Sequence, residues 1–146
     1  MHPAKTREGE LTSMAAAYGL PTVFTGLLGT RDMIAGYNAA DLVVHPSLQE
    51  IFPNAVGEAM ACARPVVAAD AGGTAELVGR DGSAGVLVPP SDATALANAV
   101  ESLLDDPPRL AALGQSARRR IESEFPLERM VEGYERAIGE VTGSGG

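Results

Sequence analysis

The sequence predicts a doubly wound α/β domain of the Rossmann-like kind, in which helices cover both faces of a parallel sheet. Short uninterrupted apolar runs alternate with segments of helical pattern, as expected for strands that are buried on both faces. The length of 146 residues fits one domain, and the hydrophobic content of 45% is ordinary for a globular protein. In such sheets ligands bind beyond the carboxyl ends of the strands, so the loops there are the first candidates for a site.

Four short runs are predicted to be strands. Each is apolar or rich in β-branched residues, and each ends at or near a glycine, proline or aspartate, which are typical of turns. In chain order the predicted strands cover residues 22–26, 42–44, 65–70 and 85–90. The loops that follow the first three are TGLLGTR, HPSLQEIFPN and DAGGT.

The remaining segments carry helical signals, with apolar side chains at three- and four-residue spacing. Pro53 cannot continue a helix from upstream, whereas Asn54 and Thr74 are both favourable N-cap residues. Residues 142–146 (TGSGG) suit a flexible tail, which leaves residues 1–141 as the domain. The predicted helices cover residues 8–18, 31–40, 54–63, 74–78, 93–104, 108–125 and 127–141.

Composition excludes several classes of function. The net charge of −8 argues against nucleic-acid binding, and the basic run at 118–120 is flanked by glutamates, which favours a solvated helix face. A single cysteine, Cys62, excludes an internal disulfide framework and a multi-cysteine metal site, and it suits a small core position. No apolar run is long enough for a transmembrane segment, and residues 1–10 lack the pattern of a signal peptide. The expected location is therefore the cytoplasm.

The segment EIFPNAVGE, residues 50–58, places a glutamate at each end of a predicted helix start. If Asn54 caps the helix, the backbone N–H groups of residues 55–57 have no partner within the helix and form an anion site suited to a diphosphate. Glu58 then lies one turn into the helix, where its carboxylate can accept hydrogen bonds from the vicinal diol of a ribose. Glu50 precedes the loop and can meet a second polyol. This arrangement describes a nucleotide sugar.

Simpler interpretations of the same residues remain open. The helix dipole alone favours an acid such as Glu58 or Glu76 in the first turn of a helix, whatever the ligand. Glu50 can be a surface acid, and pairs of glutamates at this spacing arise by chance. His45, at a strand end, can face the ligand or serve the structure, and the structural role is favoured.

The motifs in their order resemble the donor-binding signature of the family 4 glycosyltransferases, which are retaining enzymes of the GT-B fold. HPSLQEIFPNAVGEAMACARPVVAADAGGTAELV resembles the centre of the signature, VFTGLLGTRDMIAGYNAADLVVHPS the preceding segment, and GVLVPPSDATALANAVESLLDDPPRLAALGQSARRRI the following one. Almost the whole chain is covered. The resemblance implies the C-terminal, nucleotide-sugar-binding domain of such an enzyme.

The resemblance also implies roles for individual residues. Glu58 matches the acid that holds the ribose hydroxyls, and Glu50 matches the acid at the donor sugar near the reacting carbon, which makes it the catalytic candidate. Gly26 matches a loop glycine close to the nucleoside, and Arg31 lies in that neighbourhood. No metal and no cofactor are implied, since amides and basic side chains balance the diphosphate charge. The turn against the sugar and the diphosphate matches Phe52, Pro53, Asn54, Ala55 and Val56.

The chain departs from the family pattern in three respects. Ile51 and Ala63 stand where the family commonly has glycine. The two strands that open the family's domain, with the Arg and Lys that contact the diphosphate, have no counterpart here, so the strand at 22–26 is expected to lack a neighbouring strand. The chain is accordingly expected to be part of a longer protein with an N-terminal acceptor-binding domain, or to work beside a partner chain.

Two functions follow as expectations. The leading one is the nucleotide-diphosphate-sugar-binding part of a retaining glycosyltransferase, inactive in transfer without the other half of the cleft. The alternative is a non-catalytic nucleotide- or sugar-phosphate-binding module or partner subunit. The donor sugar, the base, the acceptor and any peripheral association of the complete enzyme with a membrane are left open.

Overall fold

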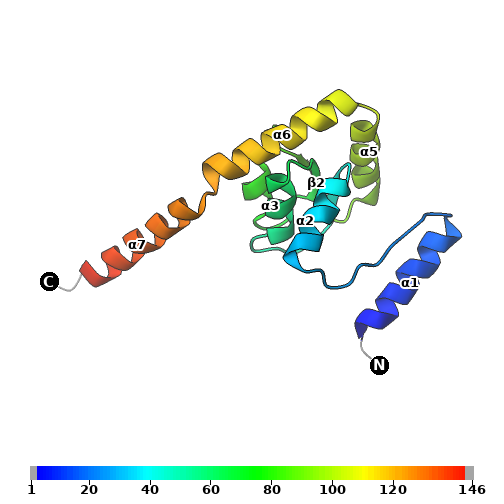
Figure 1. Ribbon diagram of the computed structural model, residues 1–146, viewed down its shortest axis with the longest axis horizontal. Coiled ribbons are helices and arrows are strands. Elements are labelled where there is room, and N and C mark those ends of the chain that lie inside the picture. Colours follow the sequence, from blue (N-terminus) through cyan, green and yellow to red (C-terminus); the bar gives the residue numbers. More distant parts are fainter. Residues whose placement is uncertain (1–2, 144–146) are drawn as a thin grey trace. The chain divides into compact units, whose positions relative to one another are not determined.

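The computed structural model describes residues 3–143, which form two compact units divided between Met33 and Ile34. The first unit contains helix α1 (Pro3–Ala17) and an extended segment that leads into helix α2 (Thr30–Ala39), and Figure 1 follows this path in blue and cyan. The second unit contains the remainder of α2, the sheet and the other helices.

The strand predicted at residues 22–26 is wrong. The segment is extended but pairs with no strand among the described residues. Val23 and Phe24 within it are exposed. A strand is held by the ladder that it forms with a neighbour, and an apolar pattern supplies no neighbour. The absence of a partner strand agrees with the expectation that this segment would lack one.

The second unit is built on a three-stranded parallel sheet. Its strands are β1 (Val43–His45), β2 (Val66–Ala69) and β3 (Val86–Val88), in the spatial order β1-β2-β3. Val44 pairs with Val67, and Val67 pairs with Val86, so the register runs straight across the sheet. Three of the four predicted strands are thus confirmed, each with bounds shifted by one or two residues.

A helix follows each strand along the chain. Pro107 opens the helix Pro107–Glu124 (α6), where the missing N–H of proline costs nothing, and Asp106 caps that helix by accepting from the Arg109 N–H at 3.1 Å. The second unit contains α3 (Asn54–Ala61), α4 (Thr74–Val78), α5 (Ala93–Leu104), α6 (Pro107–Glu124) and α7 (Leu127–Gly143). The helix α7 extends two residues into the segment expected as a tail, and residues 144–146 lie outside the described residues.

The sheet divides the core into two clusters, because successive side chains of a strand point to opposite faces. Val66 and Ala68 of β2 face a cluster that contains residues of α3, α4 and α6. Val67 faces the other cluster, with Leu103 of α5 and Leu113 of α6. All four residues of β2 are buried, as the uninterrupted apolar run predicted. Helices on both faces of a parallel sheet confirm the doubly wound class.

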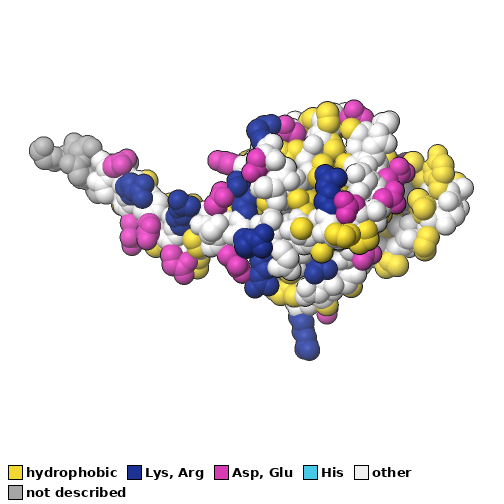
Figure 2. Space-filling view, turned by 90° about the horizontal axis from the view of Figure 1, so that it is seen from above, with side chains coloured by type: hydrophobic (Ala, Val, Ile, Leu, Met, Phe, Trp, Pro, Cys, Tyr) yellow, Lys and Arg dark blue, Asp and Glu magenta, His cyan; other side chains and the backbone are white. Residues whose placement is uncertain are grey.

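Charged side chains are mixed on the surface. On the face shown in Figure 2, acidic and basic side chains alternate along the C-terminal helix instead of gathering into a patch of one sign. Within residues 3–143, no helix is both long and apolar enough to cross a membrane.

Candidate functional site

The helix α3 begins differently from the prediction. Pro53 is its N-cap, with extended backbone (φ −78°, ψ 91°), and Asn54 is the first helical residue. The Pro53 carbonyl accepts from the N–H groups of Val56 at 3.0 Å and of Gly57 at 3.2 Å. The predicted cap at Asn54 is therefore wrong, because the proline ring fixes φ and lets the helix start one residue earlier.

This shift of the helix start changes which backbone amides are free to bind an anion. The amides of Val56 and Gly57 are occupied by the Pro53 carbonyl, whereas those of Asn54 and Ala55 have no protein acceptor within the described part of the chain. Asn54 and Ala55 are both exposed. Two free amides at the positive end of the helix dipole suit an anionic group.

Glu58 lies one turn into α3, as predicted, and is half-buried. Its Oε2 accepts a hydrogen bond of 3.1 Å from the Tyr37 hydroxyl of α2. Burial, followed by the hydrogen bond to Glu58 and the charge of that carboxylate, raises the pKa of Tyr37. Glu58 also lines a cavity of ≈ 280 Å³ together with Phe52, Asn54, Gly57, Ala61, Leu77, Ile121 and Phe125. The carboxylate is thus held at the wall of an open hollow beside the helix start.

Glu50 lies in the loop between β1 and α3, next to His45. The distance from His45 Nε2 to Glu50 Oε1 is 3.3 Å, with 18% of the His45 side chain and 29% of the Glu50 side chain exposed. His45 Nε2 is nevertheless buried and lacks the angles of a hydrogen bond. The imidazole therefore contacts the carboxylate without satisfying its own nitrogen. Sequence reasoning favoured a structural role for His45 and did not anticipate this contact.

The glycine pair of the DAGGT loop explains how the Glu50 segment is held. The Gly73 N–H donates to the Glu50 carbonyl at 3.1 Å. A Cβ on Gly72 would lie 1.8 Å from the Glu50 carbonyl oxygen, and one on Gly73 would lie 2.0 Å from that of Ile51. Only glycine allows so close an approach of two backbones. Two of the three loops predicted at the strand ends therefore meet.

The predicted N-cap at Thr74 is also wrong. Gly73 occupies the cap position of α4, and Thr74 is fully buried with its Oγ1 unpartnered. The Gly73 N–H that precedes α4 donates to the Glu50 carbonyl, and the Thr74 side chain lies in the interior. Glu76 is exposed in the first turn of α4.

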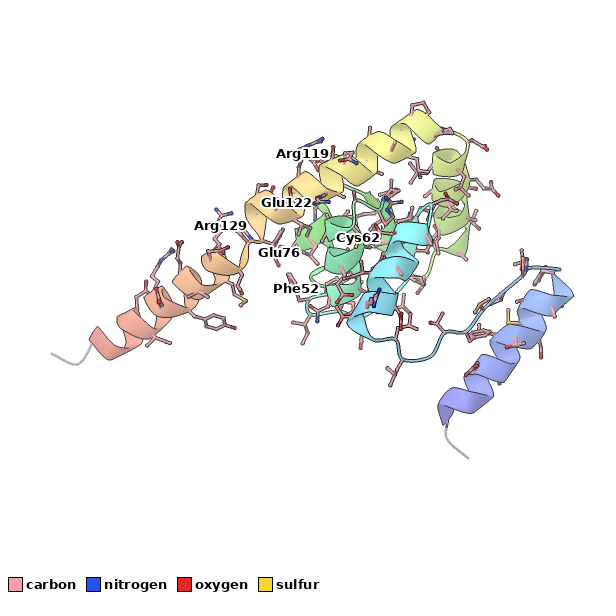
Figure 3. All side chains as sticks on the ribbon, viewed as in Figure 1. Phe52, Cys62, Glu76, Arg119, Glu122 and Arg129 are labelled. Carbon is pink, nitrogen blue, oxygen red and sulfur yellow. The ribbon has the colours of Figure 1, made fainter. Side chains whose placement is uncertain are left out.

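Phe52, in the loop before α3, packs against Phe125 at the end of α6. Its ring lies 6.2 Å from that of Phe125 at an angle of 58°, and Figure 3 shows Phe52 near one end of α3 and Cys62 near the other. Cys62, predicted as a small core residue within the helix, is the C-cap of α3 and is only half-buried, so that prediction is wrong. The side chains of Pro53 and Val56 are buried, which leaves only their backbone for a ligand. Ile51, by contrast, is 96% exposed.

Arg120 is a residue whose role the sequence reasoning missed. Only Arg118 and Arg119 of the basic run form the predicted solvated face. Arg120 is half-buried and donates to the carbonyls of Leu77 at 2.7 Å and Glu76 at 3.0 Å, which lie in α4. It thereby ties α6 to the helix behind the glycine loop. The signal for it was its position three residues after the buried Ala117, on the inward face of α6.

Gly26 and Arg31 belong to the first unit, Arg31 in the first turn of α2, and their nucleoside contacts stay predictions. Of the predicted residues in the second unit, Asn54 and Glu58 line one cavity. Glu50 lines another, of ≈ 640 Å³, and only Phe52 borders both. Within residues 3–143, no cluster of three or more His, Cys, Asp or Glu side chains is arranged to hold a metal ion.

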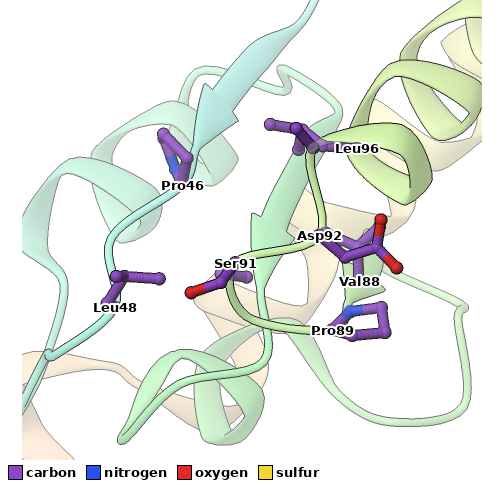
Figure 4. A pocket seen from close by; sticks show the side chains of 9 residues that line it. Pro46, Leu48, Val88, Pro89, Ser91, Asp92 and Leu96 are labelled. Atoms are coloured by element: carbon purple, nitrogen blue, oxygen red, sulfur yellow. The ribbon is translucent and has the colours of Figure 1, made fainter.

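A third cavity, of ≈ 220 Å³, opens at the strand ends and is drawn in Figure 4. It contains neither glutamate of the candidate site. Ser91 lies at its wall in a left-handed conformation (φ 62°), and the Asp92 carboxylate there caps α5 by accepting from Ala95 N–H at 2.8 Å. Its remaining lining is apolar: Pro46, Leu48, Ala69, Val88, Pro89, Ala93 and Leu96.

Comparison with known proteins places the chain in a family. The model of the family "Glycosyl transferases group 1" matches residues 3–106. An MMP alpha-(1->4)-mannosyltransferase from Mycolicibacterium hassiacum is 37% identical over 118 residues, which cover 78% of this chain and 29% of that protein. A D-inositol 3-phosphate glycosyltransferase from Kineococcus radiotolerans is 41% identical over 112 residues, covering 70% and 26%. The chain thus spans between a quarter and a third of these relatives.

Solved structures agree. The sucrose-phosphate synthase of Thermosynechococcus elongatus matches 95% of this chain and 35% of its own, with a TM-score of 0.84 and 31% identity. Alr3699/HepE of Anabaena, in complex with UDP-glucose, matches 94% of this chain and 38% of its own, with a TM-score of 0.84 and 29% identity. The fold is that of the C-terminal domain of GT-B glycosyltransferases. With most of its length matched by the family model, the chain belongs to the group 1 glycosyl transferases.

Proposed function

We propose that the chain binds the nucleotide-diphosphate-sugar donor of a retaining glycosyltransferase of family 4. The observation that carries this proposal is the pair of free amides at the start of α3, with Glu58 one turn into that helix and Glu50 in the loop that leads to it. In a chain of this family, this order of groups matches the three parts of a nucleotide sugar. Glu50 would meet the donor sugar, the free amides the diphosphate, and Glu58 the ribose.

Each part of the proposed site has a chemical task. The amides of Asn54 and Ala55 and the dipole of α3 stabilise the diphosphate, including the charge that develops on it as the bond to the sugar breaks. Glu58 accepts hydrogen bonds from the ribose hydroxyls, and Glu50 accepts from the donor-sugar hydroxyls near the reacting carbon. Charge-assisted hydrogen bonds of this kind are the stronger ones, which suits residues that set the position of a substrate.

The relatives support the nature of the ligand. The Anabaena protein was solved with UDP-glucose and with UDP, and curated relatives carry the names of mannosyl- and glycosyltransferases. Because the chain spans a minor share of those proteins, sugar transfer is proposed for an assembly that includes an acceptor-binding domain or partner chain. Transfer is expected in the cytoplasm, by displacement of the nucleoside diphosphate with retention and without a metal or cofactor.

The Glu50→Gln variant tests whether Glu50 binds the donor sugar or whether the site binds the nucleotide alone. We expect the variant to lose about tenfold in affinity for a nucleotide sugar, the cost of roughly one hydrogen bond to a charged group, and to bind the nucleoside diphosphate as the wild type does. The measurement is calorimetric titration of the chain with UDP-glucose, GDP-mannose and ADP-glucose, each beside its nucleoside diphosphate.

The control for this titration is Glu101→Gln, which makes the same change on the exposed surface of α5 and should alter neither affinity. If Glu50→Gln weakens the sugar and the sugar-free nucleotide equally, or neither, the assignment of Glu50 to the donor sugar fails. Absence of binding by the wild type to all six ligands would contradict the proposed function as a whole.

A further inference from the structure

The Glu58 carboxylate has a partner within the protein. The Tyr37 hydroxyl donates to Glu58 Oε2 at 3.1 Å across 21 positions of sequence. The contact exists because Tyr37 packs against the core cluster that contains Val56, Ala59 and Met60 on the buried side of α3. The donor is therefore fixed by the fold and not by a neighbouring turn of the same helix.

The Tyr37 hydroxyl must keep its proton in order to donate a hydrogen bond to Glu58. Its half-burial, the hydrogen bond and the nearby carboxylate charge all raise the pKa of the phenol, so the hydroxyl keeps its proton and continues to donate at physiological pH. A phenol can donate one hydrogen bond, and the carboxylate has several lone-pair positions. The contact with Tyr37 therefore leaves the Glu58 carboxylate with lone pairs to offer a ligand, and Glu58 lines the cavity beside the start of α3.

A free glutamate side chain occupies many rotamers, and a ligand that needs one of them must pay the cost of ordering it. A vicinal diol needs a single orientation of the carboxylate, because both of its hydroxyls point in fixed directions. We propose that Tyr37 is a positioning residue, whose hydroxyl holds the Glu58 carboxylate ready for the 2′- and 3′-hydroxyls of a nucleoside diphosphate. This inference rests on the proposed function, since it concerns the same ribose.

The positioning role differs from a purely structural one in a measurable way. If Tyr37 acts through Glu58, its loss weakens ligands that carry the diol and spares ligands without it. If Tyr37 only packs the core, removing its hydroxyl changes both kinds of ligand alike. Tyr37→Phe keeps the ring in the cluster and removes only the donor, so the variant is expected to fold.

The experiment is calorimetric titration of the full chain with UDP, GDP and ADP and with their 2′,3′-dideoxy counterparts. For whichever ribonucleotide binds the wild type most tightly, Tyr37→Phe should lose about fivefold in affinity, the usual effect of one hydrogen bond, while the dideoxy form changes less than twofold. In a Glu58→Ala background, Tyr37→Phe should have no further effect on the ribonucleotide. The matched control is Tyr134→Phe, at a tyrosine exposed on α7.

The titrations distinguish three cases. A loss confined to the ribonucleotide and abolished by Glu58→Ala supports the inference. Equal losses for the two kinds of nucleotide, or an undiminished loss in the Glu58→Ala background, overturn the positioning role and leave the proposed function standing. If no ribonucleotide binds the wild type, the proposed function is overturned and this inference with it.

Discussion

Gly72→Ala is expected to destabilise the chain by about 3 kcal/mol or more. The new methyl group would lie 1.8 Å from the Glu50 carbonyl oxygen, so one of the two loops must move. Overpacking of this kind costs roughly 1–3 kcal/mol, and the left-handed backbone of Gly72 (φ 52°) adds about 1–2 kcal/mol for any residue with a Cβ. Denaturant unfolding of the wild type and the variant measures the sum.

Gly82→Ala is the matched control, because Gly82 also has a left-handed backbone (φ 72°) but has open space around its Cβ position. This variant should lower the free energy of unfolding only by the cost of the left-handed backbone, about 1–2 kcal/mol. The difference between the two variants then isolates the clash with the Glu50 segment. Equal losses for Gly72→Ala and Gly82→Ala would show that the close approach of the two loops does not contribute to stability.

Glu58→Ala is expected to weaken binding of nucleotide sugars and nucleoside diphosphates alike, by roughly fiftyfold. The variant removes a charged acceptor from both ribose hydroxyls, and hydrogen bonds to charged groups are each worth about 1.5–3 kcal/mol, part of which water recovers in an open cavity. Both kinds of ligand contain the ribose, so the loss should be the same for each, unlike the selective loss expected for Glu50→Gln. Calorimetric titration of each ligand measures it.

The control here is Glu101→Ala, which removes an equal charge from the exposed face of α5 and should leave the affinities unchanged. Thermal unfolding of Glu58→Ala checks that the fold survives, since the Tyr37 hydroxyl loses its acceptor in this variant. Undiminished affinity in folded Glu58→Ala would exclude Glu58 from the ribose site.

Much of the fold could be predicted because it depends on local pattern. The run at 65–69 is apolar without interruption, which is typical of a strand buried on both faces, here β2. Most element bounds shifted by a residue or two, because caps depend on details of the backbone, as at Pro53. The first helix was misjudged further, since α1 begins at Pro3, five residues before the predicted start. The strand predicted at 22–26 failed for another reason: pairing needs a neighbour, and a segment's own residues carry no information about whether one is present.

The candidate site divides in the same way. Glu50 and Glu58 could be singled out from the helix start between them, which the sequence located to within one residue, and their ligands stay predictions. The hydrogen bonds made by these two residues were not predictable. The Tyr37 hydroxyl of α2 donates to the Glu58 carboxylate of α3, and the Gly73 N–H donates to the Glu50 carbonyl from a different loop. Such contacts follow from packing between segments far apart in the chain.

The central claim is that the start of α3 receives the diphosphate of a nucleotide sugar. The most direct test is an amide spectrum of the ¹⁵N-labelled chain, recorded as UDP-glucose, GDP-mannose or ADP-glucose is added. For the ligand that binds, the largest shifts are expected at the free amides of Asn54 and Ala55, with smaller ones near Glu58. Shifts concentrated instead at Leu48, Ser91 and Asp92 around the strand-end cavity, with Asn54 and Ala55 unmoved, would contradict the account.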